Sequence, residues 1–298
     1  MNRGGFITRL RKSPAFPLTV VLVALMGLWY AAAILMNLTL VRDAFEREET
    51  EYTTMELIAG TLDAERPLLP APHQIIETFV DGVVGYPPDS NRSLIYHSWV
   101  TLSAALAGLA MGVALGIGLA VLIVHVRVLE KSLLPWIIAS QMVPVLAIAP
   151  ITIVVLGSIG IRGLLPKALI SAYLCIFPVV IGMVKGLTSP DRQHRDLMHN
   201  WSATPAQTFF KLRWPAAIPY LFASLKVSMA ISIVGAVVGE LPTGAQAGIG
   251  ARLLAGSYYG QTVQIWAALL AISIVAASFV GLVGVLERLV ARRMGGAP

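Results

Sequence analysis

Residue types that often do enzyme chemistry are present in this sequence, but their spacing matches no catalytic or metal-binding motif. The five histidines are scattered in loops or at the ends of apolar runs, and the single cysteine, Cys175, lies inside such a run. The patterns HExxH, GxSxG and GxxxxGK[ST] are absent, so neither a zinc protease helix, a nucleophile elbow nor a phosphate loop is predicted. One cysteine forms no intrachain disulfide. We therefore expect a non-enzymatic chain with no catalytic, cofactor-binding or metal residues. The histidines are His73, His97, His125, His194 and His199.

Few polar side chains interrupt the apolar runs. Gln141 is the most central of them, Lys226 can extend its long stem toward the interface, and Glu240 ends one run. Ion-coupled transporters place ionisable residues at mid-membrane, where these groups carry the ion or proton. The sequence therefore disfavours a stand-alone ion-coupled or passive membrane transporter, which remains the alternative; a membrane enzyme or scaffold ranks lower still.

The elements that position these residues are long apolar helices. The chain has 298 residues, of which 56% are hydrophobic and 13% charged, against about 25% charged in soluble domains. A run of roughly 20 apolar residues spans a bilayer as a helix, and no run alternates as a barrel strand would. We predict an all-α polytopic membrane protein with six transmembrane helices. They are expected at about 17–38, 98–124, 134–156, 166–186, 217–239 and 262–286.

Charge predicts the orientation and divides the chain into segments. With the N-terminus inside, 14 of the 22 lysines and arginines flank the inner ends of the spans, so both termini are expected in the cytoplasm. We interpret the first run as an uncleaved signal anchor rather than a cleaved signal peptide, because its apolar stretch is too long. The expected segments are a cytoplasmic N-terminus with the first helix (1–40), an acidic periplasmic segment (41–97), a five-helix core (98–290) and a cytoplasmic tail (291–298).

Two features of these segments have two interpretations each, and a third predicts a kink. The acidic segment holds 11 of the 16 acids and is either a solvated outer loop or a docking surface for an external partner. Small residues at every fourth position of the second span indicate close helix packing or a moving interface. Pro144 and Pro150 predict a kink in the third span, which a helix lining a pathway could use. The small residues are Ala104, Gly108, Gly112, Gly116 and Ala120, with helix packing assigned to the three glycines.

The long inner loop, 187–216, carries the most specific pattern. From about Asp196 its apolar residues recur at helical spacing, and Ser202, Thr204 and Pro205 indicate a turn. We expect two short amphipathic helices joined by that turn at the inner face of the membrane.

This loop resembles the EAA motif of the binding-protein-dependent ABC importer permeases. Counting back from Pro215, Asp196 stands at the motif's Glu, Ser202 at its Gly and Leu212 at its Ile. Leu197 and Met198 replace the two alanines, which is the largest departure. In that family the loop is the cytoplasmic coupling helix, which docks into a groove of an ATPase subunit; a helix binding only lipid headgroups is the alternative. The resemblance implies coupling roles for Asp196, Leu197, Met198, Trp201, Ser202, Ala203, Leu212 and Pro215.

Other stretches resemble the nitrate, sulfonate, taurine and pyrimidine-precursor branch of the same family. These are residues 68–79, the third span with its paired prolines, and the fifth span with the glycine-rich loop that follows it. The resemblance implies the type I ABC importer permease fold. It also implies that Glu240 lies at the outer end of the pathway, where it gates or meets the binding protein; the neighbouring proline and glycines indicate a capping or loop-ordering role instead. The candidate pathway residues are Ser140, Gln141, Met142, Pro144 and Glu240.

The function that the resemblance implies is binding-protein-dependent transport. The chain is expected to be the multi-pass permease subunit of an importer in the bacterial cytoplasmic (inner) membrane. It would move a small polar solute from periplasm to cytoplasm: a pyrimidine-like heterocycle, a sulfonate such as taurine, or nitrate. The implied partners are two ABC ATPase subunits that hold ATP and Mg²⁺, a second permease copy in a homodimer, a periplasmic solute-binding protein and the lipid bilayer, with no nucleic acid.

Overall fold

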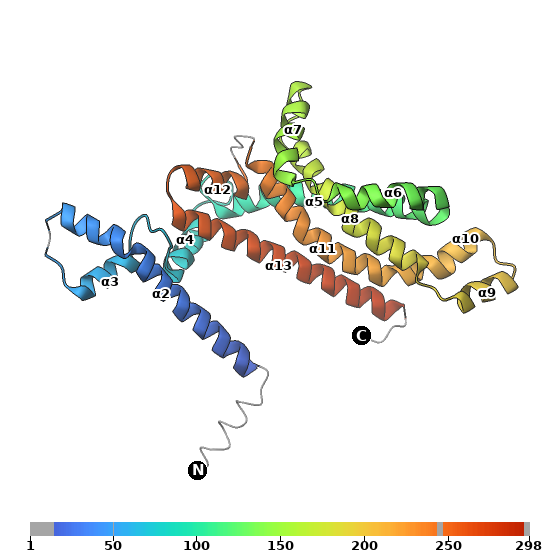
Figure 1. Ribbon diagram of the computed structural model, residues 1–298, viewed down its shortest axis with the longest axis horizontal. Coiled ribbons are helices and arrows are strands. Elements are labelled where there is room, and N and C mark those ends of the chain that lie inside the picture. Colours follow the sequence, from blue (N-terminus) through green and yellow to red (C-terminus); the bar gives the residue numbers. More distant parts are fainter. Residues whose placement is uncertain (1–14, 50, 243–246, 295–298) are drawn as a thin grey trace, which may run out of the picture. The chain divides into compact units, whose positions relative to one another are not determined.

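A computed structural model describes residues 15–49, 51–242 and 247–294, and this part of the chain contains helices and no strand. The described chain forms two compact units. The N-terminal unit is Met1–Tyr86 with Ala255–Leu269, and the core unit is Pro87–Leu254 with Leu270–Pro298. The helices, labelled in Figure 1, are α2 (Ala15–Arg47), α3 (Thr54–Leu62), α4 (Pro72–Val84), α5 (Leu94–His125), α6 (Arg127–Ser140), α7 (Val145–Ser158), α8 (Leu164–Thr188), α9 (Arg192–Asn200), α10 (Pro205–Thr208), the π-helix η1 (Phe209–Arg213), α11 (Trp214–Glu240), α12 (Ile249–Tyr258) and α13 (Thr262–Arg293).

Helices α5, α8 and α11 form the packed centre of the core unit. The glycines expected to pack helices lie on the face of α5 that contacts α8: Gly108 meets Ser171, Gly112 meets Cys175 and Gly116 meets Val179. A Cβ at any of the three glycines would come within 3 Å of its neighbour. The flat face thus lets the two backbones approach closely, which is how membrane helices gain packing contacts.

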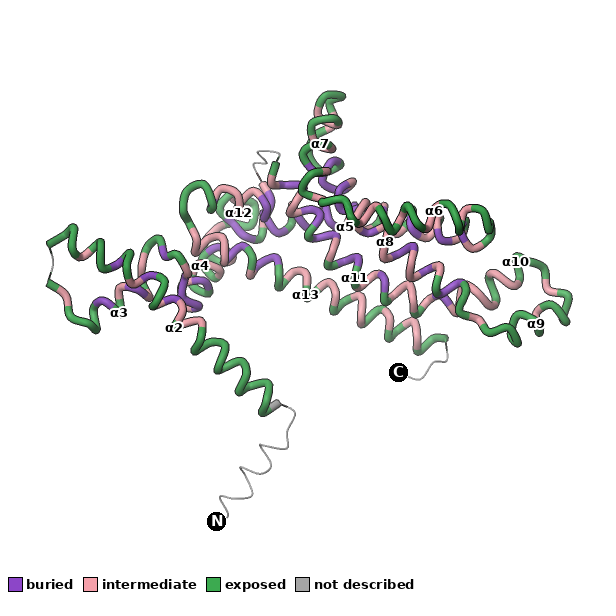
Figure 2. Tube along the Cα trace, in the orientation of Figure 1, coloured by how far each residue is buried: buried purple, intermediate pink, exposed green. Residues whose placement is uncertain are grey.

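Burial follows this packing. A cluster of fully buried apolar side chains joins the three helices toward the end of α5, and Figure 2 shows buried positions repeated along all three. In contrast, α6 has no buried residue and α7 has one, Ala149. Their apolar side chains are therefore available to lipid or to another protein surface. The cluster comprises Ala120, Val179, Met183, Leu187 and Ala217.

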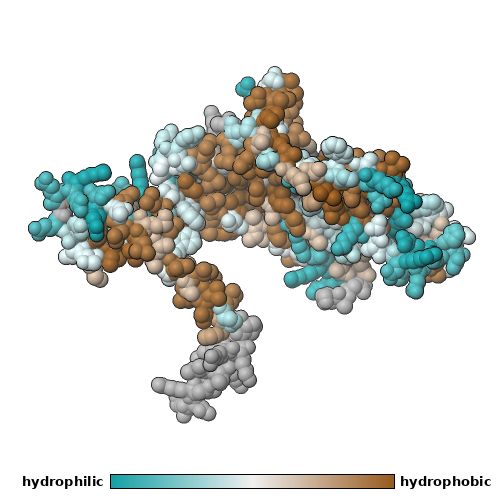
Figure 3. Space-filling model, in the orientation of Figure 1, coloured by the Kyte–Doolittle hydropathy of each residue, from teal (hydrophilic) through white to brown (hydrophobic). Residues whose placement is uncertain are grey.

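Five of the described helices are long and apolar enough to cross a membrane, and six spans result if the α6–α7 pair counts as one. Apolar surface covers α7 and much of the core unit in Figure 3, whereas hydrophilic surface gathers around α9 and α10. The chain is therefore a multi-pass membrane protein. The five helical stretches are Phe16–Arg47, Leu94–His125, Leu164–Thr188, Pro205–Glu240 and Thr262–Arg293.

The third expected span differs from a kinked helix. α6 and α7 meet at a 96° bend, with a break of four residues between Ser140 and Val145. Pro144 stands in an extended conformation before the first residue of α7, where its fixed φ and missing amide N–H are compatible with a helix start. Pro150 lies inside α7 without breaking it. Of the two prolines, only Pro144 coincides with the bend.

The inner loop also differs from the expected pair of short helices. The first helix, α9, and the turn after it are present. The second begins at Pro205, where Thr204 and Gln207 form a capping box, but it does not end as a short helix. It continues through η1, a single π-helical turn, into α11. The apolar residues of its first turns, including Phe209, pack onto the end of the central cluster, which explains why the helix runs on.

In the N-terminal unit, α2 holds the connection between α3 and α4 through one buried polar side chain. Asn37, fully buried, donates from Nδ2 to the carbonyl oxygens of Thr61 (3.1 Å) and Leu69 (2.9 Å). Its Oδ1 accepts from the amides of Leu68 (2.8 Å) and Leu69 (3.3 Å). Trp29 Nε1 also donates to the Pro70 carbonyl oxygen at 3.1 Å. These bonds satisfy backbone groups that no helix satisfies.

Candidate functional site

A polar cluster lies where α5 begins and α11 ends. Its centre is Glu240, the last residue of α11, which is fully buried. The Glu240 carboxylate accepts from Thr101 Oγ1 on α5 at 2.9 Å and from Lys167 Nζ on α8 at 3.3 Å. Lys167 is 7% exposed, so this is a buried ion pair. We call His97, Thr101, Lys167 and Glu240 the polar cluster.

The polar cluster holds the loop that leads into α12. Three consecutive backbone amides donate to it: Gly248 to His97 Nδ1 (3.0 Å), Ile249 to Thr101 Oγ1 (2.8 Å) and Gly250 to Glu240 Oε2 (2.8 Å). Lys167 Nζ donates to the carbonyl oxygen of Ala247 at 3.4 Å. The first amides of a helix have no acceptor within that helix. Side chains from α5 and α11 thus take the place of a local cap, and the loop is fixed to three helices.

The bonds of His97 define its protonation. Its Nδ1 accepts from Gly248, so the ring proton lies on Nε2, which donates to the Asn91 carbonyl oxygen at 2.9 Å. This assignment follows from the hydrogen-bond network. His97 is therefore a neutral structural histidine that contacts the same loop.

Glycine is required at position 248. Its φ is +120°, a conformation that L side chains rarely adopt, and a Cβ there would overlap the Glu240 carboxyl group. The loop consequently approaches the carboxylate more closely than any other residue would allow. This close approach explains why a glycine stands at position 248 in the loop after α11.

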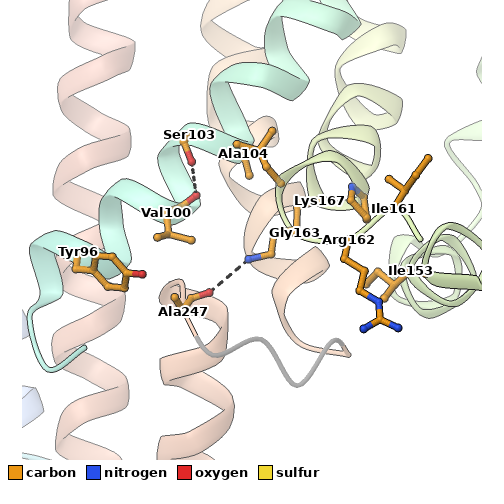
Figure 4. Close-up of a pocket in the computed structure, with 13 residues that line it drawn as sticks. Tyr96, Val100, Ser103, Ala104, Ile153, Ile161, Arg162, Gly163, Lys167 and Ala247 are labelled. Atoms are coloured by element: carbon orange, nitrogen blue, oxygen red, sulfur yellow. Dashed lines mark hydrogen bonds between the residues drawn. The ribbon is translucent and has the colours of Figure 1, made fainter. Parts of the chain in front are cut away.

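A cavity of about 830 Å³ adjoins the polar cluster within the core unit, and we call it the core cavity. Lys167 belongs to both, since its side chain lines the cavity and its ammonium group is turned toward Ala247 (Figure 4). Glu240 does not line it. Lining residues come from α5, α7, the α7–α8 connection, α8 and the loop before α12; they include Tyr96, Ser103, Ile153, Arg162, Lys167 and Ala247.

The candidate pathway residues lie elsewhere, except for Glu240 in the polar cluster. Ser140, at the end of α6, accepts a hydrogen bond on its carbonyl oxygen from the Tyr173 hydroxyl of α8. Gln141 follows it, and its Nε2 is buried without a hydrogen-bond partner among the described residues. Met142 is 82% exposed, and Pro144 precedes α7. None of these four lines the core cavity. Glu240 accepts from the Gly250 amide at the start of α12, a contact that is compatible with a loop-ordering role.

The candidate coupling residues lie at the opposite end of α11. In α9, Asp196 pairs with Arg192 at 3.7 Å on the exposed surface. Trp201 is 71% exposed and follows the last residue of α9. Ser202 has a φ of +51°, so the position where the family motif has Gly adopts a left-handed conformation. Leu197 and Met198 lie in α9, Ala203 in the turn, Leu212 in η1 and Pro215 in the first turn of α11.

Sequence reasoning missed three of the four members of the polar cluster. Lys167 stands beside Pro166 at the start of the fourth expected span, whereas His97 directly precedes the second expected span and Thr101 lies at its start. One signal was available: a lysine inside an apolar run needs an anionic partner, and Glu240 is the acid that ends another run. The pairing of helices α8 and α11 that joins the two residues is not visible in the sequence.

The chain is similar in sequence to known membrane transport proteins. Residues 112–296 match the family described as the binding-protein-dependent transport system inner membrane component. The chain is 31% identical over 194 residues to the formylaminopyrimidine transport permease protein ThiX of Halalkalibacterium halodurans, covering 65% of this chain and 72% of the relative. It is 31% identical over 225 residues to the riboflavin transport system permease protein RibX of Chloroflexus aurantiacus, covering 76% and 80%.

A third relative extends the range of solutes. The chain is 25% identical over 233 residues to the putative aliphatic sulfonates transport permease protein SsuC of Bacillus subtilis, covering 78% of this chain and 80% of the relative. The family match covers more than half of the chain, and the expected resemblance is confirmed. The chain therefore belongs to the inner membrane components of binding-protein-dependent transport systems, and it is the permease subunit of an ABC importer.

Proposed function

We propose that α9, the turn after it and the start of the α10–η1–α11 helix are the docking surface for an ABC ATPase subunit. Leu197, Trp201 and Phe210 are 44%, 71% and 67% exposed there. Large apolar side chains gathered in one short, otherwise hydrophilic region favour a helix-in-groove contact. ATP and Mg²⁺ are then bound by the ATPase, and this chain binds no cofactor.

The observation that carries this proposal is the continuity of the helix between the docking surface and the polar cluster. Pro205–Glu240 is one helical stretch of 36 residues, about 54 Å long at 1.5 Å per residue. Movement of the docking surface when two ATPases close would therefore reach Glu240 through a continuous helix. In this proposal, the break between α6 and α7 is the segment of the translocation pathway that changes conformation when the docking surface moves. Ser140, Gln141, Met142 and Pro144 lie at this break.

The remaining partners follow from this arrangement. One chain offers one docking surface, and ATP sites form between two ATPases, so two permease copies form a homodimer. The exposed apolar faces of α6 and α7 are compatible with such a contact. The distribution of lysines and arginines supports a cytoplasmic position for both termini, and a periplasmic solute-binding protein delivers the solute from the outside.

The solute is a small polar molecule taken up from the periplasm. The names of the similar permeases include formylaminopyrimidine, riboflavin, aliphatic sulfonates and nitrate. We propose a pyrimidine-like heterocycle, a sulfonate such as taurine, or nitrate for this chain.

Co-purification from the native membrane tests the docking surface. The tagged chain is expected to retain an ATPase, whereas the double variant Leu197→Ala/Trp201→Ala should lose it and lose solute uptake. Trp99→Ala is the matched control, because Trp99 is also exposed (63%) but lies near the start of α5. A double variant that still binds the ATPase as the unmodified chain does would refute the assignment.

A further inference from the structure

The core cavity has the size of a solute-binding site. Its volume of about 830 Å³ lies within the range of roughly 300–1,000 Å³ found for small-molecule pockets. Its wall next to the polar cluster is fixed, because Lys167 and Ala247 are held there by hydrogen bonds. The cavity is therefore bounded partly by groups that hydrogen bonds fix to the polar cluster.

The charges that line the core cavity are positive. Arg162 and Lys167 are on its wall, and none of the described lining residues is acidic. Glu240 balances Lys167 from behind the wall. Arg162 forms no ion pair with any described residue, and its side chain is exposed. One positive charge thus remains without a counterion at the cavity.

The start of α8 adds to this electrostatic field. Gly163, which precedes Leu164, the first residue of α8, has no side chain to accept from the first amides of the helix, and both residues line the cavity. Helix N-termini carry partial positive charge and bind anions. The guanidinium group and this helix end therefore favour negative charge in the same space. Tyr96 supplies a hydroxyl group on the α5 side, whereas the Ser103 hydroxyl donates to the Val100 carbonyl oxygen at 2.8 Å (Figure 4).

We propose that the core cavity binds a small organic solute with one negative charge, and that Arg162 binds its anionic group. This inference deepens the proposed function and rests on it, since it names the solute class of the same permease. The volume exceeds what a bare inorganic anion fills, and a single unbalanced cation matches a single negative charge. Among the solutes proposed above, an alkanesulfonate therefore fits better than a neutral heterocycle or nitrate.

Binding to the full-length permease in lipid nanodiscs tests this inference. Ethanesulfonate and the neutral dimethyl sulfone are used as probes, and their affinities are measured by saturation-transfer NMR. We expect ethanesulfonate to bind and dimethyl sulfone to bind at least about tenfold more weakly, because a charge-assisted hydrogen bond is lost. Arg162→Gln should weaken ethanesulfonate binding about tenfold or more, whereas Arg162→Lys should retain most of it. Arg127→Gln, which removes an exposed arginine at the start of α6, should change nothing.

Each outcome decides the inference separately from the proposed function. Equal binding of the two probes, no binding of ethanesulfonate, or an Arg162→Gln variant that binds as before would overturn it. In all three cases, continued co-purification of the ATPase would leave the importer assignment of the docking surface intact. Conversely, charge-selective binding that depends on Arg162, found for a chain that retains no ATPase on purification from its native membrane, would support the cavity and refute the docking surface.

Discussion

The N-terminal unit and the core unit each fix an irregular segment with a buried polar side chain from a long helix, but the chemistry differs. Asn37 of α2 is a neutral amide whose four hydrogen bonds all go to backbone groups at the end of α3 and in the connection that follows it. Glu240 of α11 is a charged group whose partners come from α5, α8 and the loop before α12. The first arrangement joins one helix to one segment, whereas the second joins three helices to a loop.

Asn37 and Glu240 differ in how far their stability in the protein interior depends on other side chains. A satisfied amide is stable in an apolar environment without help from a charge. A buried carboxylate is stable only while its cation and hydrogen-bond donors stay in place, because an unpaired buried charge is costly. Any shift of α8 relative to α11 therefore acts on the loop through Lys167 and Glu240. We expect the core unit, rather than the N-terminal unit, to report helix movements at this loop.

Removing the cation of the polar cluster should have the largest effect on stability. Lys167→Met leaves Glu240 buried without its ion-pair partner, which costs about 3–5 kcal/mol in comparable cases. The double variant Lys167→Met/Glu240→Gln removes both charges and should recover most of that loss. Equilibrium unfolding in mixed micelles measures both. A double variant no more stable than Lys167→Met would show that the side chains, and not the uncompensated charge, matter.

A second prediction separates the loop conformation from the charge. Gly248→Ala forces a Cβ toward the Glu240 carboxyl group at a φ of +120° and should destabilise the chain by about 3 kcal/mol. Gly281→Ala is the control, because Gly281 lies inside α13, has no atom within 4 Å of its Cβ position and has no positive φ. It should leave the unfolding midpoint unchanged or raise it slightly. Equal midpoints for the two variants would contradict the close approach.

Long apolar runs made the helices predictable, and local spacing made the docking loop predictable. The ranges of five spans and the glycine positions of α5 follow from residue type and period alone, because lipid leaves a helix few alternatives. The turn after α9 followed from Ser202, Thr204 and Pro205. These features are local, so a single sequence contains them.

The polar cluster and the α6–α7 break could not be read in the same way. Thr101, Lys167 and Glu240 are separated by up to 139 residues, and only tertiary packing brings them together. Pro144 predicts a bend, but its size depends on neighbours such as Tyr173, which holds Ser140 from α8. For the same reason the sequence does not indicate the core cavity, whose lining comes from α5, α7, the α7–α8 connection, α8 and the loop before α12.

The N-terminal unit gives a smaller expected effect that stays local. Asn37→Leu leaves two amides and two carbonyl oxygens without their side-chain partner, at a cost of about 2 kcal/mol. The connection between α3 and α4 should then open, so a Glu-specific protease should cut at the exposed Glu65 faster than in the unmodified chain. Thr39→Leu, an exposed neighbour on α2, is the control. Faster cutting in the control, or no change in Asn37→Leu, would show that the Asn37 amide does not hold the connection between α3 and α4.

The smallest effect is expected at the surface, where a carboxylate caps a helix without burial. At the start of α3, the Thr53 amide and Oγ1 both donate to Glu56 Oε2 at 2.8 Å. The backbone bond first, and the hydroxyl bond second, hold the pKa of Glu56 below the ordinary value for glutamate. Because the folded-state pKa is lowered, the cap stabilises α3 above the unfolded-state pKa and loses this contribution as the pH falls through the folded-state value.

Carbon-13 NMR of the Glu56 carboxyl group measures this pKa directly. We expect a value below that of an unstructured glutamate, and Thr53→Val should move it only part of the way back, because the backbone bond remains. A pKa at the ordinary value in the unmodified chain would show that the cap does not form in the membrane-embedded protein. The exposed carboxylate differs from Glu240 in one decisive respect: water can replace each of its partners. Its loss should therefore fray α3 locally, while loss of the Lys167–Glu240 pair disturbs three helices at once.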